Sequence, residues 1–190
     1  GSAAENAIES SDFVREASAA YRTPIDYGQG GGLAVNLQRV AALVAAKMPT
    51  RLYYVTYAGN AFDTHVHQKN MHDGLMRELN DGLTAFQSDL TAQAHADRVL
   101  TLVFSEFGRR VQENASEGTD HGVAGPMFLL GARVKGGFHG AAPSLTDLDE
   151  GDLKMSTDFR RVYASVLEDW VKTDAGRVLG GAFEKLPLLG

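Results

Sequence analysis

The stretch RLYYVTYA at residues 51–58 decides the predicted fold. β-branched and aromatic residues fill it and Gly59 follows, a pattern typical of a buried strand. VLTLVF at 99–104 and MFLL at 127–130 are predicted as further strands, and FHG at 138–140 as a short fourth one.

Helical patterns separate these runs. Residues 3–20 are rich in alanine, and apolar residues recur at helical spacing over 33–44 and again from about 68 to 95. Ser156 is a predicted N-cap, and the helix after it has an apolar face extending to Trp170. The alternation predicts an α/β fold with a mostly parallel sheet and one domain over 1–190.

Composition excludes several classes of protein. A net charge of −6, from 18 basic and 24 acidic residues, argues against a nucleic-acid-binding surface. No apolar run reaches the roughly 18 residues of a membrane span. The chain has no cysteine, so any metal must bind aspartate, glutamate or histidine. Gly1-Ser2 resembles a cloning remnant, and the glycine-rich run at 28–32, which lacks the Lys-Ser/Thr of a P-loop, is predicted to be a connector.

The first candidate site is FDTHVHQ at 62–68, just after the first predicted strand. Sites in open α/β sheets form beyond the carboxyl ends of strands. Asp63, His65 and His67 lie within five residues, and His72 follows in the next predicted helix. These side chains favour a divalent metal site. The alternative is that they are exposed loop histidines and an aspartate that caps the helix.

Two further polar loops belong to the same predicted sheet edge. In SEFGRR at 105–110, Glu106 is a candidate metal ligand and Arg109 a candidate anion-binding group, or else Glu106 forms an ion pair with Arg109 or Arg110.

GTDHG at 118–122 places Asp120 and His121 in a glycine-flanked loop before a predicted strand, and His139 is a weaker candidate. The chain has no Gly-x-Ser-x-Gly motif and no dinucleotide fingerprint.

Taken together, FDTH, SEFGR, GTDHG, KGGFHG (135–140) and STDFRRVYASVLEDW (156–170) resemble domain-of-unknown-function family 1501. The resemblance extends from about Tyr21 to the end of the chain. It implies membership of the alkaline phosphatase and sulfatase superfamily and a three-layer α/β sandwich. It also implies that this chain is the C-terminal portion of a larger bacterial protein that is periplasmic or exported.

The resemblance further implies metal binding, with zinc expected first and calcium, magnesium or manganese as alternatives. One metal would be held by Asp63, by His65 or His67, and by the distant His121. At the position of a second metal site the chain has Glu106 followed by Phe107, and phenylalanine cannot ligate a metal.

The function implied is metal-dependent hydrolysis of a small phosphate or sulfate ester. Arg109 would neutralise the anionic substrate, and supporting roles would fall to Arg110, Asp120, His72 and His139. The superfamily's nucleophile has no match here, so the chain alone is expected to be inactive. A competing hypothesis is a non-catalytic exported α/β module that binds a polyanionic or glycan partner.

Overall fold

The computed structural model describes residues 3–28, 31–57, 59 and 61–190. The predicted remnant Gly1-Ser2, part of the predicted connector at 28–32, and Ala58 lie outside the described residues. The chain divides into two compact units. The helical unit comprises Gly1–Thr64 and Lys69–Val99, and the hairpin unit comprises His65–Gln68 and Leu100–Gly190.

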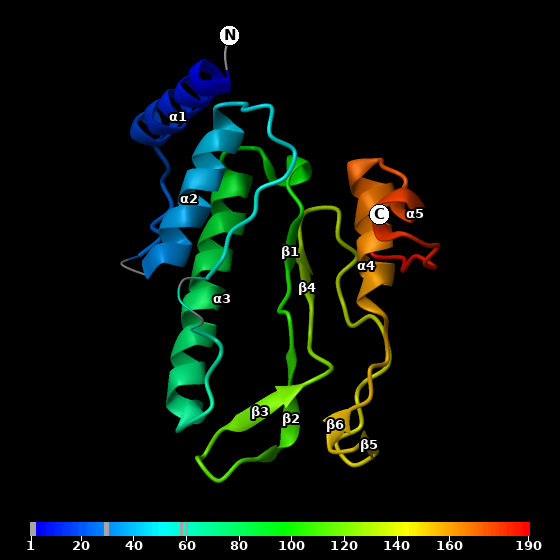
Figure 1. Cartoon of the computed structure of the whole chain (residues 1–190). Coiled ribbons are helices and arrows are strands. Elements are labelled where there is room, and N and C mark those ends of the chain that lie inside the picture. Colours follow the sequence, from blue (N-terminus) through cyan, green and yellow to red (C-terminus); the bar gives the residue numbers. More distant parts are fainter. Residues whose placement is uncertain (1–2, 29–30, 58, 60) are drawn as a thin grey trace. The chain divides into compact units, whose positions relative to one another are not determined.

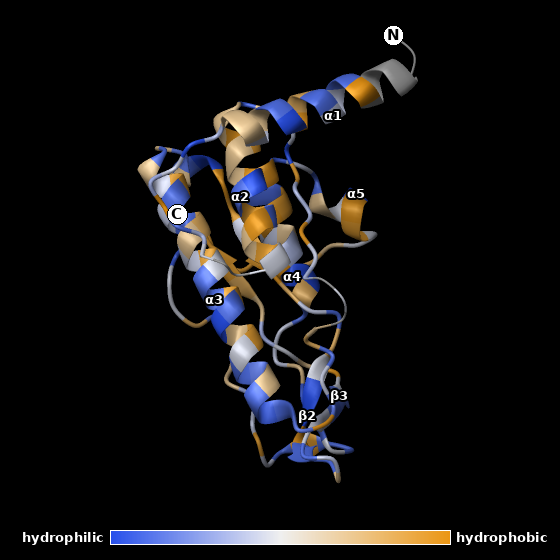
Figure 2. Cartoon of the chain, turned by 90° about the vertical axis from the view of Figure 1, so that its left-hand side faces the viewer, coloured by the Kyte–Doolittle hydropathy of each residue, from blue (hydrophilic) through white to orange (hydrophobic). Residues whose placement is uncertain are grey.

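Three helices make up most of the helical unit: α1 (Ala3–Ala20), α2 (Gly31–Ala45) and α3 (Gln68–Ala92) (Figure 1). They confirm the helices predicted from alanine content and apolar spacing. Buried residues of α2, of α3 and of the segment before α2 form one core: Tyr27, Ala34, Leu37, Ala41, Val44, Ala85, Phe86 and Leu90. Hydrophobic residues line α2, whereas the first half of α3 is mostly hydrophilic (Figure 2).

A buried carboxylate anchors the segment before α2 to α3. Asp89 is fully buried, and its oxygens accept hydrogen bonds from three hydroxyl groups. The Tyr21 and Tyr27 hydroxyls each donate to Oδ2 at 2.8 Å, and Thr23 Oγ1 donates to Oδ1 at 2.5 Å. Burial and the hydrogen bond to Asp89 raise the pKa of both tyrosines above the ordinary range.

The stretch that suggested the first strand is irregular. Residues 51–57 form no strand, and exposure alternates along them, with Leu52 82% and Tyr54 74% exposed. The prediction of a buried strand here is wrong. β-branched and aromatic composition reports how well a segment fits a pleated surface, but a strand also needs a hydrogen-bonded neighbour, which composition does not supply.

The hairpin unit contains three short antiparallel pairs in place of a parallel sheet. β1 (Thr101–Val103) pairs with β4 (Phe128–Leu130), β2 (Gly108–Glu113) with β3 (Thr119–Gly122), and β5 (Leu148–Asp149) with β6 (Asp152–Leu153). The predicted three-layer sandwich with a mostly parallel sheet is therefore wrong.

The apolar runs at 99–104 and 127–130 do form strands, but they run antiparallel to each other. Parallel neighbours need a crossover of a dozen or more residues, usually a helix. Here the chain between β1 and β4 folds back on itself as the β2–β3 hairpin, which reverses its direction (Figure 1).

Further local predictions in this unit also fail. The polar loops predicted at 105–110 and 118–122 contribute residues to the paired strands β2 and β3, and the predicted strand at 138–140 does not form. Residues 141–154 contain β5 and β6. The hairpin strands GRRVQE and TDHG are polar and largely exposed, so they lack the apolar alternation that identifies a strand in sequence.

The last predicted helix is confirmed in part. α4 (Phe159–Ser165) continues directly into the π-helix η3 (Val166–Val171), and the short α5 (Ala175–Leu179) follows. The N-cap is Asp158, whose side chain accepts a hydrogen bond from the backbone N–H of Arg160. The predicted N-cap, Ser156, instead donates to the carbonyl oxygen of Ala141.

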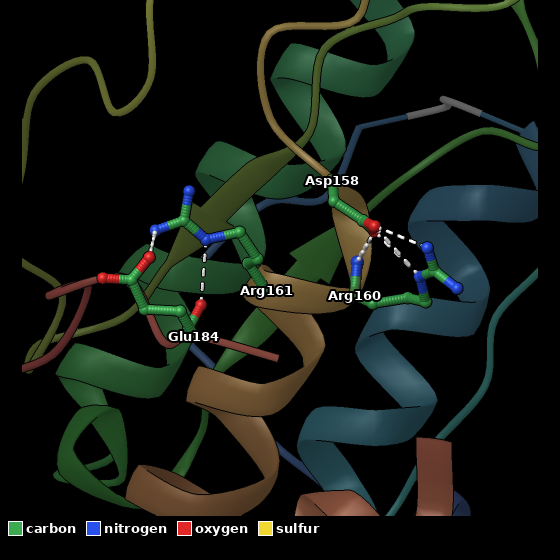
Figure 3. Close-up of polar contacts among 4 residues, drawn as sticks. All are labelled: Asp158, Arg160, Arg161 and Glu184. Atoms are coloured by element: carbon green, nitrogen blue, oxygen red, sulfur yellow. Dashed lines mark hydrogen bonds and ion pairs between the residues drawn. The ribbon is translucent and has the colours of Figure 1, made fainter. Parts of the chain in front are cut away.

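The C-terminal segment is fastened to α4. Nε and Nη2 of Arg161 donate to the carbonyl oxygen and to Oε2 of Glu184, both at 2.9 Å, and Arg160 binds the Asp158 carboxylate nearby (Figure 3). Ser165 is fully buried, and its Oγ accepts a hydrogen bond from the Leu186 N–H at 2.8 Å. Within the described part of the chain, no helix has both the length and the apolar character needed to cross a membrane.

Candidate metal centre

The β2–β3 hairpin brings two of the predicted polar loops together. In its register Gly108 lies opposite Gly122 and Arg109 lies opposite His121. Both glycines are buried where the backbones approach closely: a Cβ on Gly108 would lie 1.7 Å from the Ala124 carbonyl oxygen. The SEFGRR and GTDHG motifs are therefore neighbours in one hairpin.

Asn114 organises the hairpin loop. Its Oδ1 accepts hydrogen bonds from the N–H groups of Ser116 and Gly118 at 2.9 and 3.1 Å, an arrangement by which asparagine stabilises tight turns. Its Nδ2 lies within hydrogen-bonding distance of the carbonyl oxygen of His65 (3.2 Å) and of Asp120 Oδ1 (3.1 Å). One side chain thus shapes the turn and binds the segment that carries His65.

The segment at 65–68 lies along this loop through backbone hydrogen bonds. The N–H of His67 donates to the Ser116 carbonyl oxygen at 2.8 Å, and that of Gln68 to the Glu117 carbonyl oxygen at 2.9 Å. Gly118 permits the close approach, since a Cβ there would lie 2.1 Å from the His65 carbonyl oxygen. These contacts place His65 beside the hairpin although it lies 56 residues before His121.

His65 and His121 face each other through their ring nitrogens. Their Nε2 atoms are 3.1 Å apart. Two nitrogens that ligate one tetrahedral zinc ion at 2.0–2.1 Å are about 3.3 Å apart, so this separation suits a shared metal. Asp63 precedes His65 by only two residues, and one ligand atom from each of the three side chains lies within 4.8 Å of the others.

Phe107 and Arg109 lie beside the His65–His121 pair. The Phe107 ring stacks on His121 with centroids 3.7 Å apart and an interplanar angle of 15°. The guanidinium carbon of Arg109 lies 5.4 Å from the Phe107 centroid, and its Nη1 donates to the Thr119 carbonyl oxygen at 2.7 Å. If a tetrahedral metal were bound here, two imidazoles and a carboxylate would supply three ligands and one position would stay open for water or substrate.

Comparison with known proteins gives one family. The model of the family described as "Protein of unknown function (DUF1501)" matches residues 3–182. The chain belongs to this family. No curated protein and no solved structure matches the chain.

His65 and His67 have different partners in this DUF1501 chain. His65 lies against His121, whereas Nδ1 of His67 is 2.7 Å from Oε2 of Glu117, with both side chains exposed. Both His67 and Glu117 have a left-handed backbone, with φ of 44° and 59°. The turn at His67 thus directs its side chain to Glu117 while His65 contacts His121.

Other predicted site residues do not belong to the ligand group of Asp63, His65 and His121 found among the described residues. Glu106 is exposed and is not part of the ligand group found among the described residues. Arg110 forms an ion pair with Asp152 of β6 at 3.5 Å, and Asp120 is held by Asn114. His139 Nε2 lies 2.9 Å from the Lys135 carbonyl oxygen, within its own loop.

His72, the remaining predicted residue, lies on α3 in the helical unit. Its ring is edge-on to that of Phe62, with centroids 5.9 Å apart, and its Nδ1 is buried without a hydrogen-bond partner.

Sequence reasoning missed three residues that shape the site: Asn114, Gly118 as a point of close approach, and Phe107 as a ring partner. An asparagine four residues before a glycine in a polar stretch is a turn signal that could have identified Asn114. Nothing local to the sequence connects Phe107 with His121, because the stacking follows from the hairpin register.

Proposed function

We propose that this chain provides metal ligands of a hydrolase that cleaves phosphate or sulfate esters, in an exported bacterial protein of the alkaline phosphatase and sulfatase superfamily. Zinc is the expected ion, held by Asp63, His65 and His121. The observation that carries the proposal is the 3.1 Å separation of the two Nε2 atoms, with a carboxylate of the same loop close by.

The donor set fits a catalytic ion. Histidine nitrogen and carboxylate oxygen are common zinc ligands, and sites with three protein ligands keep a position open for chemistry. A bound divalent ion would polarise the ester oxygens and lower the pKa of a bound water or hydroxyl group. In this chain, Asn114 and Gly118 fix the backbone of His65, and the β2–β3 pairing fixes that of His121.

Positive charge near the ligands supports an anionic substrate. Arg109 lies opposite His121 in the hairpin, and a guanidinium group suits phosphate and sulfate oxygens through paired N–H donors. Its hydrogen bond to the Thr119 carbonyl oxygen holds the side chain in the hairpin. Arg109 therefore orients and neutralises the ester in the proposed reaction.

Metal binding by the purified chain tests the first part of the proposal. We expect about one zinc ion per chain by elemental analysis and calorimetry, and loss of binding in His65→Ala and His121→Ala. His139→Ala is the matched control, because this exposed histidine lies 2.9 Å from the Lys135 carbonyl oxygen of its own loop and is not part of the ligand group found among the described residues. No zinc binding by the wild-type chain would contradict the proposal.

Hydrolysis is measured with the full-length natural protein, because no residue of this chain matches the nucleophile that the superfamily uses. Release of nitrophenol from nitrophenyl phosphate or sulfate should require the metal and should fall by orders of magnitude in His121→Ala. Zinc binding without hydrolysis would instead support a non-catalytic binding module.

A further inference from the structure

Phe107 forms a stacked contact with a proposed metal ligand. Its ring lies 3.7 Å from that of His121, centroid to centroid, and the two planes differ by 15°. Phe107 is half-buried and immediately precedes Gly108, which β2 pairs with Gly122, the residue after His121. The backbone pairing of Gly108 with Gly122 therefore places the Phe107 and His121 side chains next to each other.

The stack restricts the rotation of an exposed side chain. His121 is exposed, and an exposed histidine rotates about both of its side-chain torsions. A flat ring against one face of the imidazole limits that rotation and leaves the ring edge accessible. The Nε2 atom on that edge is the one that lies 3.1 Å from Nε2 of His65.

Phe107 is itself held in place. The Arg109 guanidinium lies over its ring at 5.4 Å, within the range of a cation–π contact. The same guanidinium donates to the carbonyl oxygen of Thr119, two residues before His121 on β3. Arg109 on β2 thus contacts the Phe107 ring, and its guanidinium is held by the Thr119 carbonyl oxygen on β3.

We propose that Phe107 is a positioning residue that holds the His121 imidazole with Nε2 directed toward His65. Resting on the proposed function, this role makes Phe107 a determinant of zinc affinity although it has no ligand atom. Groups that orient a ligating histidine typically change metal affinity by about 10–100-fold when removed.

The test compares Phe107→Leu, which keeps apolar bulk but cannot stack, with Phe107→Tyr, which keeps the ring. Zinc affinity is measured by competition calorimetry, and the ligand geometry by the visible spectrum of the Co²⁺-loaded protein. We expect Phe107→Leu to bind zinc about tenfold more weakly, with an altered Co²⁺ spectrum, and Phe107→Tyr to match the wild type. Phe138→Leu is the control, since Phe138 is fully exposed in another loop.

A measurement on the metal-free protein tests the contact between Phe107 and His121 independently of zinc binding. The ring current of Phe107 should shift the His121 ring-proton resonances upfield in the metal-free protein, and the shift should vanish in Phe107→Leu and persist in Phe107→Tyr. Absence of the shift in the wild type, or equal zinc affinity and Co²⁺ spectra in wild type and Phe107→Leu, would overturn the positioning role. A shift present in a wild type that binds no zinc would refute the metal site and, with it, the role of Phe107 in zinc affinity.

Discussion

Gly118 lies so close to the backbone of His65 that a Cβ on it would be 2.1 Å from the His65 carbonyl oxygen. Real Cβ atoms do not approach an oxygen this closely, so any side chain at this position would push the two segments apart. The glycine of the GTDHG motif thus permits His65 to lie against the hairpin loop.

Gly118→Ala is therefore expected to weaken zinc binding by about tenfold or more, since the ligand pair would lose its spacing. Calorimetry with Zn²⁺ measures the effect. Gly136→Ala is the matched control, because a Cβ on Gly136 would meet nothing within 4 Å. Equal zinc affinity in Gly118→Ala and wild type would show that this close approach does not position His65.

The hydrogen bonds to Asp89 make a separate prediction about stability. Tyr27→Phe removes a donor from a fully buried carboxylate and should lower the free energy of unfolding by about 1–3 kcal/mol. Urea denaturation followed by circular dichroism measures this change. Tyr54→Phe, at an exposed position, should change stability by no more than about 0.5 kcal/mol. A similar small effect of Tyr27→Phe would mean that water replaces the lost donor.

The raised pKa values of Tyr21 and Tyr27 lead us to expect a loss of stability at alkaline pH. The folded-state pKa values of Tyr21 and Tyr27 are raised above the unfolded value of about 10, so the fold favours their protonated forms. Their contribution to the free energy of unfolding is fully present below the unfolded pKa of about 10. It is lost as the pH rises from there through the folded-state pKa values. Absorbance titration at alkaline pH should show these two hydroxyls ionising after exposed tyrosines, together with unfolding. Simple titration of every tyrosine near the ordinary value, with the fold intact, would contradict the prediction.

The attachment of the C-terminal segment depends on Ser165. Its Oγ accepts from the Leu186 N–H and lies 3.0 Å from the Leu186 carbonyl oxygen, in a fully buried position. Ser165→Ala leaves that N–H without its acceptor and should lower stability by about 1–3 kcal/mol. Faster hydrogen exchange should accompany the change at residues 184–190. Ser88→Ala, on an exposed position of α3, is the control and should leave exchange in the tail unchanged.

The helices were predictable because their signal is local. The spacing of apolar residues in α2 and α3 defines one apolar face on each helix. The core forms where these two faces are buried. The boundary of α4 was less accessible, because Ser156 and Asp158 are both good N-caps in sequence. Only the hydrogen bond from the Arg160 N–H to Asp158 distinguishes them.

By itself, the sequence determined the long helices α1 to α3 and the absence of cysteine ligands, and it identified Asp63, His65 and His121 as candidate ligands. The tertiary structure decided that the short strands run antiparallel, that 51–57 forms no strand, and that His65 rather than His67 lies against His121. Helical faces depend on residues three or four apart, whereas strand pairing and side-chain contacts join residues far apart in the chain. The register of β2 with β3, which places Phe107 on His121, is such a long-range relationship.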